Sequence, residues 1–538
     1  MDQDRVKISI EGYGDIYVEK GVLLGSVLEN KGLIPLPCHG QGLCGLCRVE
    51  VLYDGLSSPT EREKMVLGGE LPSARLACQA RVMDYTRIRI PEQKTRVRLE
   101  KKFLLPKLRK LRPIVEILDL RLGEKLLDVD LVISSGDCEG GGYAVVYGKH
   151  MICSMKKSPD NLLLVDMGTT TLTMLKAGLN GEVRSSLVVL NPLYKYGLDI
   201  ISRGEKASED KQVASEMRKT IINTFLRIAD PGTALVLVAG NSINTYLAAG
   251  LPMRSLIEYP YQPPVRGSIL VPVNPPVLLA PIIAGQVGGD MLMNLLATHH
   301  MRIKKPYMVI DIGTNAEIAL IKEDEILVVS APAGPAIEGY VGKGSWSGRG
   351  GVYVVEVSGA DEPVFIVHGD PRRGFMGSGI ISLIHGLYVN GFIDRSGRFV
   401  KGYKIINGLK AFIVDEENNL YFTLKDMREI QKALATIKAG WKTVLGESGL
   451  SPDELSRVII TGNPVQKLGR RILYDLGLSP TINIDVFPNL VPYGMYLYAF
   501  SDKYRSRAYR ILWKARHIVL TGKSYASTWI ESLMLGPK

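Results

Sequence analysis

Two stretches of the chain share one pattern, and this repeat constrains the fold more than any other feature. The stretches are LLLVDMGTTTLTMLKAG at 162–178 and YMVIDIGTNAEIALIKE at 307–323. Each reads as an apolar strand, then Asp-x-Gly-Thr, then a second apolar strand, and the two align without gaps through their centres. A hairpin repeated at the start of two stretches of alternating strands and helices predicts a duplicated, layered α/β domain.

The turn of each hairpin carries groups that suit a phosphate. Glycine allows a tight turn whose backbone N–H groups can face an anion, and neighbouring hydroxyl and amide groups add donors. Asp166 and Asp311 end the first strand of each hairpin, and a buried carboxylate is costly unless it holds a cation or accepts hydrogen bonds. The pattern therefore predicts a joint Mg²⁺ and phosphate site with these two aspartates as candidate catalytic residues. The candidate phosphate-binding residues are Gly168, Thr169, Thr170, Gly313, Thr314 and Asn315.

A second pair of segments supports the duplication. ALVLVAGNSINTYLAAG at 234–250 and RVIITGNPVQKLG at 457–469 both read as a strand, then Gly-Asn, then a helix. A helix N-terminus at a strand end is a place where a nucleotide can bind. The same pattern also fits ordinary strand-to-helix turns, which is the plainer interpretation. The candidate nucleotide-binding residues here are Gly240, Asn241, Gly462 and Asn463.

Four cysteines near the start of the chain predict a metal cluster. Three lie in the glycine-rich loop PCHGQGLCGLCRV and one in LACQARV, which is how a [2Fe-2S] cluster is held. The flanking segments predict strands at 5–10 and 15–18, a helix at 23–32 and a further strand after the loop. That order is typical of the β-grasp ferredoxin fold. The candidate ligands are Cys38, Cys44, Cys47 and Cys78, whereas Cys138 and Cys153 are expected to be buried thiols.

Charge and composition change along the chain and suggest domain limits. Residues 94–112 hold nine basic residues and a single acid, so we expect a basic linker at 93–112 between a ferredoxin domain at 1–92 and the rest. A small α/β segment is expected at 113–160. The duplicated domain then fills 161–538, with halves at about 161–300 and 301–538.

The charge and the apolar segments limit the expected partners. The net charge of +11 has no nucleic-acid-binding motif beside it, which favours an acidic protein partner over nucleic acid. The longest apolar run, at 268–285, contains four prolines that would break a membrane-spanning helix. The charged N-terminus is unlike a signal peptide, so we expect a cytoplasmic protein that does not enter a membrane.

The hairpins resemble the phosphate-1 and phosphate-2 motifs of the acetate kinase, sugar kinase, heat-shock chaperone and actin superfamily, which has a ribonuclease H-like fold. Together with the cysteine loop they resemble the reductive activators of corrinoid proteins. The resemblance covers nearly the whole chain. It is carried by DMGTT (166–170), NPLYKYGLDIISR (191–203), VAGNSINTYL (238–247), DIGTNAEIAL (311–320), APAGPAIEGY (331–340), GFMGSGIISLIHGL (374–387) and LKDMREIQKALATIKAG (424–440).

The resemblance implies a function and its cofactors. The four cysteines would ligate the cluster through the C-x5-C-x2-C spacing, and the two turns would bind ATP with Mg²⁺. Gly462 and Asn463 would lie at the adenosine loop, where Asn463, followed by Pro464, replaces the usual paired glycine. The protein would be an ATP hydrolase that passes a low-potential electron to a corrinoid methyl-transfer protein, taking Co(II) to Co(I). A reduced ferredoxin is an expected electron donor, and a homodimer is left open.

Three alternatives remain at this point. The same machine could act on another low-potential metalloenzyme, such as a nickel enzyme of a methanogen. The chain could instead be a small-molecule kinase with a ferredoxin sensor, for which Glu338 in GPAIEGY is the candidate general base. It could also be a non-enzymatic ferredoxin with an ATP-sensing docking domain.

Overall fold

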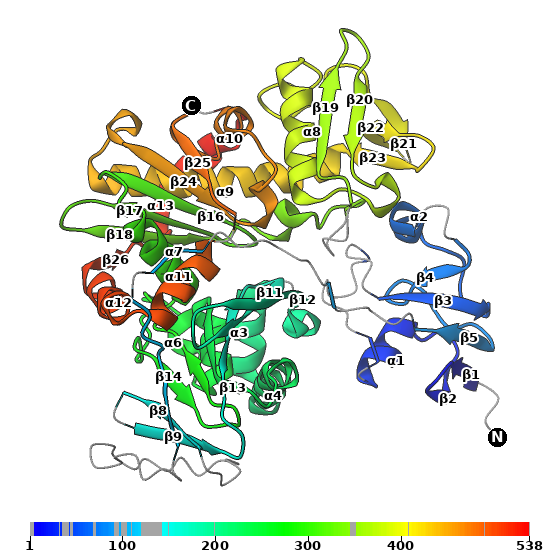
Figure 1. The fold of residues 1–538 in the computed structure, drawn as a ribbon. Coiled ribbons are helices and arrows are strands. Elements are labelled where there is room, and N and C mark those ends of the chain that lie inside the picture. Colours follow the sequence, from blue (N-terminus) through cyan, green and yellow to red (C-terminus); the bar gives the residue numbers. More distant parts are fainter. Residues whose placement is uncertain are drawn as a thin grey trace.

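The fold consists of a small N-terminal domain beside a larger body that has two sheets at its centre (Figure 1). The computed structural model describes residues 5–31, 33–34, 42, 47–67, 71–90, 96–97, 105–108, 110–119, 143–148, 150–197, 199–344, 351–406, 408–488 and 490–536. No helix in these ranges is both long enough and apolar enough to span a membrane.

The N-terminal domain has the mixed five-stranded sheet of a β-grasp fold, as the sequence predicts. Its strand order is β2-β1-β5-β3-β4, and β1 pairs antiparallel with β2 but parallel with β5. A buried ion pair fastens one edge, because Arg75 on β4 donates from Nε to Glu63 on α2 at 2.8 Å. The elements are β1 (Arg5–Ile10), β2 (Gly14–Glu19), α1 (Leu24–Asn30), β3 (Arg48–Tyr53), α2 (Glu61–Leu67), β4 (Ala74–Leu76) and β5 (Thr86–Arg89).

The first half of the body is built on a seven-stranded sheet of order β14-β15-β13-β10-β11-β12-β6. Its edge strand β6 (Arg96–Val97) comes from the basic segment that precedes the body and pairs with β12. The other elements are β10 (Asn161–Met167), β11 (Thr171–Gly178), β12 (Val183–Leu190), η4 (Pro192–Tyr196), α3 (Ile200–Glu209), α4 (Lys211–Ile228), β13 (Thr233–Gly240), α5 (Ser242–Ala249), α6 (Arg254–Ile257), β14 (Ile269–Val271), β15 (Val277–Leu279) and α7 (Gly289–His300).

The second half is built on a six-stranded sheet of order β25-β24-β16-β17-β18-β26. Its elements are β16 (Tyr307–Ile312), β17 (Ala316–Ile321), β18 (Ile326–Ala331), η5 (Pro335–Glu338), α9 (Leu424–Ser448), η7 (Pro452–Glu454), β24 (Arg457–Thr461), η8 (Asn463–Val465), α10 (Arg470–Asp475), β25 (Ile484–Val486), α11 (Leu490–Phe500), α12 (Asp502–Lys514), β26 (Ala515–His517) and α13 (Gly522–Ser532).

Two smaller units complete the body. An insertion between β18 and α9 forms the lobe at the top of Figure 1, and a three-stranded sheet of order β7-β8-β9 lies at the bottom. The elements of the lobe are β19 (Val354–Ser358), β20 (Val364–His368), η6 (Pro371–Arg373), α8 (Gly377–Val389), β21 (Lys404–Ile406), β22 (Leu409–Asp415) and β23 (Leu420–Thr423). Those of the lower sheet are β7 (Glu116–Asp119), β8 (Tyr143–Tyr147) and β9 (His150–Met155).

The two halves repeat one strand arrangement, which bears out the predicted duplication. In the first half β13 runs parallel to β10, and β10, β11 and β12 follow as antiparallel neighbours. In the second half β24, β16, β17 and β18 are arranged in the same way. The hairpin turns differ by one residue, because Asp166 faces Thr173 across its hairpin whereas Asp311 faces Glu317. The ungapped alignment of the two hairpins therefore fails beyond the turn.

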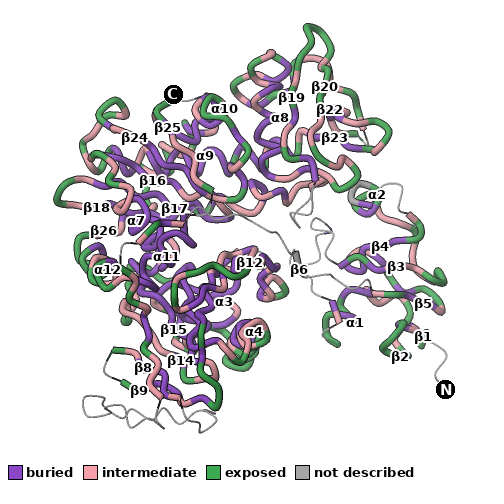
Figure 2. The backbone as a smooth tube through the Cα atoms, viewed as in Figure 1, coloured by how far each residue is buried: buried purple, intermediate pink, exposed green. Residues whose placement is uncertain are grey.

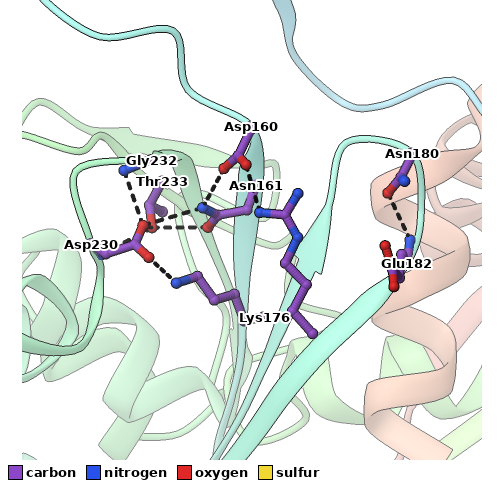
Figure 3. A network of polar contacts seen from close by, with 9 residues as sticks. Asp160, Asn161, Lys176, Asn180, Glu182, Asp230, Gly232 and Thr233 are labelled. Carbon is purple, nitrogen blue, oxygen red and sulfur yellow. Dashed lines mark hydrogen bonds and ion pairs between the residues drawn. The ribbon is translucent and has the colours of Figure 1, made fainter.

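A polar network fixes the register of the first sheet at the end remote from the turn (Figure 3). Asn161 at the start of β10 accepts from Thr233 Oγ1 at 3.0 Å and donates to Asp230 at 3.2 Å. Lys176 on β11 forms an ion pair with Asp230. The neighbouring strands β13, β10 and β11 are thus tied together at one end of the sheet, which favours a single register.

The core joins the two halves. Helices α7 and α11 pack against each other, and their buried residues share one apolar cluster with residues from β10, β16 and β17. Figure 2 shows these central segments as buried along most of their length. The two strands that carry the hairpin turns, β10 and β16, therefore share one continuous apolar core.

One expectation about cysteine is wrong. Cys153 on β9 is in a disulfide and is not a free thiol. Cys138, Cys38 and Cys44 lie outside the described residues.

Candidate functional site

One cavity between the two halves collects most of the residues that the sequence singled out. Its volume is about 120 Å³, and it lies where the turns after β10 and β16 face each other. The predicted residues that line it are Asp166, Gly168, Thr169, Thr170, Asn241, Asp311, Gly313, Thr314, Asn315, Gly462 and Asn463. Gly240 directly precedes Asn241 and is not itself in the lining.

The turns approach each other closely. Thr170 Oγ1 and Thr314 Oγ1 are 3.3 Å apart, so the two hairpin turns share a hydrogen bond across the cleft. Asn191 supports the first turn, because its Nδ2 donates to Gly168 O at 2.7 Å and its backbone N–H to Thr170 O at 2.8 Å. The first turn is thus held by the segment that leads into η4.

The Gly-Asn segments approach the hairpins in the same way in each half. A Cβ atom on Gly240 would lie 2.5 Å from Met167 O, and one on Gly462 would lie 2.0 Å from Ile312 O. Gly462 also has φ +113°, which side chains rarely adopt. Only glycine lets these strand ends lie against the residue that follows each aspartate, so both halves need it at the same place.

Three further carboxylates line the cavity, and the sequence motifs point to only one of them. Glu338 was named only as the candidate base of a kinase, and Asp290 and Glu317 were not named. Glu317 was missed because the register of the second hairpin, which places it opposite Asp311, cannot be read from the sequence. Asp290 stands in the first turn of α7, after a Gly-Gly pair, and only the fold brings it here.

Electrostatics set this cavity apart from the rest of a basic protein. Among the described residues, no lysine, arginine or histidine lines it. Burial raises the pKa of Asp290 to about 7 and that of Asp311 to about 6, and the neighbouring carboxylates add to both shifts. Burial followed by repulsion from Asp290 also raises the pKa of Glu317 well above its usual value. A divalent cation would relieve this repulsion.

The donor set fits Mg²⁺ together with a phosphate. Mg²⁺ takes oxygen ligands, keeps several waters and usually binds through one or two carboxylates. In the described part of the chain no three acidic, cysteine or histidine side chains form a preformed metal cage, which suits such loose binding. Asp311 Oδ2 is oriented by Asn294 Nδ2 at 2.7 Å, and this leaves its other oxygen to face a ligand.

Glu338 is engaged within the site. Its Oε1 accepts from Thr314 N at 2.6 Å and from Thr314 Oγ1 at 2.6 Å. A carboxylate oxygen that already accepts two hydrogen bonds would have to break them before it could take a proton from a substrate. The geometry therefore does not favour Glu338 for the proton abstraction that a small-molecule kinase would need.

The cysteine site is described in part. Cys47 and Cys78 are both buried, Cys47 directly before β3 and Cys78 just after its partner strand β4, and Ala77 N donates to Cys47 O at 2.9 Å. Gln79 Nε2 lies 3.7 Å from Cys78 Sγ, where it can donate to sulfur. A Cβ on Gly25 would lie 2.8 Å from the Cys78 backbone, so α1 packs directly on this strand end. Two neighbouring buried thiols fit half of the ligand set of a [2Fe-2S] cluster.

Three family models match the chain in sequence. Residues 9–83 match the 2Fe-2S iron-sulfur cluster binding domain, residues 163–302 the RACo middle region, and residues 305–537 the C-terminal domain of RACo, the ASKHA domain. The middle-region model thus falls on the first half of the body.

Curated relatives and a solved structure agree with these matches. The chain is 27% identical to the corrinoid activation enzyme RamQ of Eubacterium limosum over 73% of this chain and 74% of that protein. It is 28% identical to the [Co(II) methylated amine-specific corrinoid protein] reductase of Methanosarcina barkeri, over 35% of this chain and 37% of that protein. A structure of a reductive activator for corrinoid, iron-sulfur protein has the same fold, with a TM-score of 0.69 and 22% identity over 99% of this chain and 98% of the other.

Two adjoining RACo models, a ferredoxin-type model and a shared fold thus cover the body and the N-terminal domain. The chain belongs to the RACo family of reductive activators of corrinoid proteins.

Proposed function

We propose that this protein is an ATP-dependent redox activator that delivers one low-potential electron to a corrinoid methyl-transfer protein, reducing Co(II) to Co(I). The observation that carries the proposal is the joint cavity, in which two donor-rich turns face each other above several carboxylates. The family relatives named for corrinoid activation and reduction support the choice of acceptor.

The residues have distinct roles in this proposal. Thr314 and the two turns bind phosphate, while Asp166 and Asp311 hold Mg²⁺ and orient water. Cys38, Cys44, Cys47 and Cys78 bind the cluster, which supplies one-electron transfer. Gly462 and Asn463 border the adenosine, and Asn241 orients Thr169 through a contact of 3.5 Å.

ATP is needed because the electron transfer is difficult. Ferredoxin clusters of plant type have potentials near about −400 mV, and Co(II) of a corrinoid requires a very negative potential. Nucleotide binding changes the outcome only if the two nucleotide states bind the partner with different affinity. Closure of the cleft around ATP is the event that would supply this difference.

The proposal extends to the setting of the reaction. A reduced ferredoxin donates the electron, the protein works in the cytoplasm, and two copies form a homodimer. The charge distribution supports an acidic partner, since 66 lysines and arginines stand against 55 aspartates and glutamates.

The test is an anaerobic reconstitution with a corrinoid protein, titanium citrate as reductant, and Mg²⁺-ATP. We expect the Co(I) absorbance to appear with ATP and the full-length protein and to stay absent without either. Equal Co(I) formation with and without ATP would show that the nucleotide plays no part. A nickel enzyme activated in place of the corrinoid protein would change the acceptor and leave the rest standing.

A further inference from the structure

A buried arginine in the first half lacks a full set of partners. Arg203 on α3 has a fully buried side chain, and its Nε donates to Gly197 O at 2.9 Å. Its Nη1 makes no hydrogen bond to any residue of the described chain. A buried cation without a paired anion is unfavourable, so a guanidinium kept in this state points to a partner that arrives under other conditions.

The ionisable groups that act on Arg203 lie partly in the other half. Burial lowers the pKa of Arg203 to about 10, whereas Tyr340, Asp199 and Glu338 act in the opposite direction. Tyr340 and Glu338 belong to η5 and the residues after it, in the second half. The guanidinium therefore already lies within the field of the Glu338 carboxylate, although no hydrogen bond joins them.

Glu338 at the same time occupies the donors that a phosphate would use. Its Oε1 takes both the backbone N–H and the hydroxyl of Thr314, each at 2.6 Å. A Cβ built on Gly313 would lie 3.4 Å from this same oxygen, so the carboxylate lies directly over the turn. A carboxylate and a phosphate are both anions, and they cannot share these donors.

We propose that a phosphate bound at the Thr314 turn displaces the Glu338 carboxylate, which then pairs with the guanidinium of Arg203. Arg203 is a positioning residue in this scheme, since it acts through Glu338. The inference rests on the proposed function, because it assumes that ATP binds at this turn. Its consequence is a charged link between α3 of the first half and η5 of the second that forms only when phosphate is present.

The test is a double-mutant cycle on Mg²⁺-ADP-PNP binding, measured by calorimetry on the full-length, cluster-loaded protein. Glu338→Gln removes the competing charge, and we expect binding to tighten about threefold. Arg203→Met leaves the displaced carboxylate without a partner, and we expect binding to weaken about tenfold, or about 1.4 kcal/mol. In the Glu338→Gln background, Arg203→Met should change affinity by less than about twofold.

A second readout separates pairing from a purely structural role. Without nucleotide, the effects of Arg203→Met and Glu338→Gln on the thermal midpoint should be nearly additive, because the two side chains interact only through a weak field and share no hydrogen bond there. With Mg²⁺-ADP-PNP they should become non-additive. The matched control is Arg218→Met on α4, whose Nε also donates to a backbone carbonyl, that of Ala248 at 3.3 Å; it should leave affinity unchanged.

Each outcome decides the matter. The proposal would be overturned if Arg203→Met weakened Mg²⁺-ADP-PNP binding equally in both backgrounds. It would also be overturned if Glu338→Gln bound the nucleotide more weakly than the wild type, because Glu338 would then act as a cation ligand. If Arg203→Met does not fold, Arg203→Lys keeps the charge, and the same cycle should show non-additivity of about threefold. No binding of Mg²⁺-ADP-PNP to the wild type would refute the proposed function as well, whereas binding with an additive cycle would refute only this inference.

Discussion

At the scale of single residues, the buried carboxylates of the cavity lower the stability of the folded protein at neutral pH. Asp311 has a raised pKa of about 6 because it is buried near Glu338, and only Asn294 donates to it in the described contacts. When the pKa of an aspartate is raised in the folded state, the folded protein loses stability as the pH rises from the unfolded pKa to the folded one. The folded protein therefore carries a penalty at neutral pH that a cation in the cavity would remove.

The first prediction concerns this penalty. A rise of the Asp311 pKa from 3.8 to about 6 corresponds to at most about 3 kcal/mol at pH 7, and less to the extent that solvent reaches this half-buried residue at the cavity wall. We expect Asp311→Asn to raise the free energy of unfolding at pH 7 by about 1 kcal/mol while lowering ATP-dependent activation about a hundredfold. Thermal melts and the Co(I) assay check both. Full activation by the variant would exclude Asp311 from catalysis.

The second prediction concerns acid stability. Burial lowers the pKa of His517 to about 4, and its Nε2 has no hydrogen-bond partner in the described chain. The unfolded chain protonates this histidine below pH 6.5 and the folded chain does not until about pH 4, so stability falls as the pH drops through this window. At pH 5 we expect the cost to be about 2 kcal/mol.

The variant His517→Gln should remove this cost. Between pH 7 and pH 5, its thermal midpoint should fall by about 2 °C less than that of the wild type, since the unfolding entropy of so large a body makes each kcal/mol a small shift. Parallel midpoints for both proteins across this range would show that His517 is accessible to protons in the folded state. The exposed His368, which contacts Glu356 at 2.6 Å, offers a control at which the same substitution should have little effect.

At the scale of elements, the strands and turns were predictable because their signals are local. Alternating apolar runs and Asp-x-Gly-Thr need only neighbouring residues, and both hairpins form where the sequence predicts them. The one-residue difference between their turns could not be predicted, since it depends on which residue pairs across the strands. Asp290 was missed for a similar reason, because α7 brings it to the cavity from a separate part of the chain.

The third prediction tests the element that supports the first turn. Asn191 donates to Gly168 O and also accepts from Leu193 N at 3.0 Å to cap η4. Asn191→Asp keeps the cap but places a second oxygen against the Gly168 carbonyl. We expect KM for ATP to rise about tenfold, in line with the loss of a buried donor, with a smaller change in kcat.

The control for Asn191→Asp is Asn180→Asp. Asn180 Oδ1 also accepts from a backbone N–H, that of Glu182 at 3.1 Å, but it lies at the far end of the sheet (Figure 3). This variant should leave KM unchanged. Equal effects of the two substitutions would show that the added charge, and not the support of the turn, changes KM.

At the scale of the whole molecule, the N-terminal domain lies beside the first half and shares a groove with it. Glu29, Leu33 and Ile34 of the N-terminal domain line this groove together with residues of η4, α3 and α4. The two modules are predictable from the sequence but this contact is not, because a docking surface has no local motif. The basic segment was expected only as a linker, yet its Arg96–Val97 joins the first sheet as an edge strand.

The groove lies between the segment that supports the first phosphate-binding turn and the residues that precede the cysteine loop. The segment that starts at Asn191 and supports the first turn continues into η4, whose Tyr194, Lys195 and Tyr196 line the groove opposite Glu29. Leu33 and Ile34 lie just before the cysteine loop in the chain. A shift of the first turn on nucleotide binding would therefore reach the surface that contacts the N-terminal domain through η4 alone. This short element touches both sites, so the coupling needs no longer chain of residues.

The fourth prediction tests the contact at this groove by exchanging two charges across it. Lys206 on α3 and Glu29 line the same groove with opposite charges, and the acids Glu209, Asp210 and Glu216 line it as well. We expect Lys206→Glu and Glu29→Lys each to slow Co(I) formation up to about fivefold at low salt, the range of an exposed ion pair, and the double exchange to recover most of the rate. The rates of all variants should converge at high salt, because salt screens the interaction between the two charges. Failure of the double exchange to recover the rate would mean that the N-terminal domain transfers its electron from another position, and the path from the first turn through η4 would then have no role in delivery.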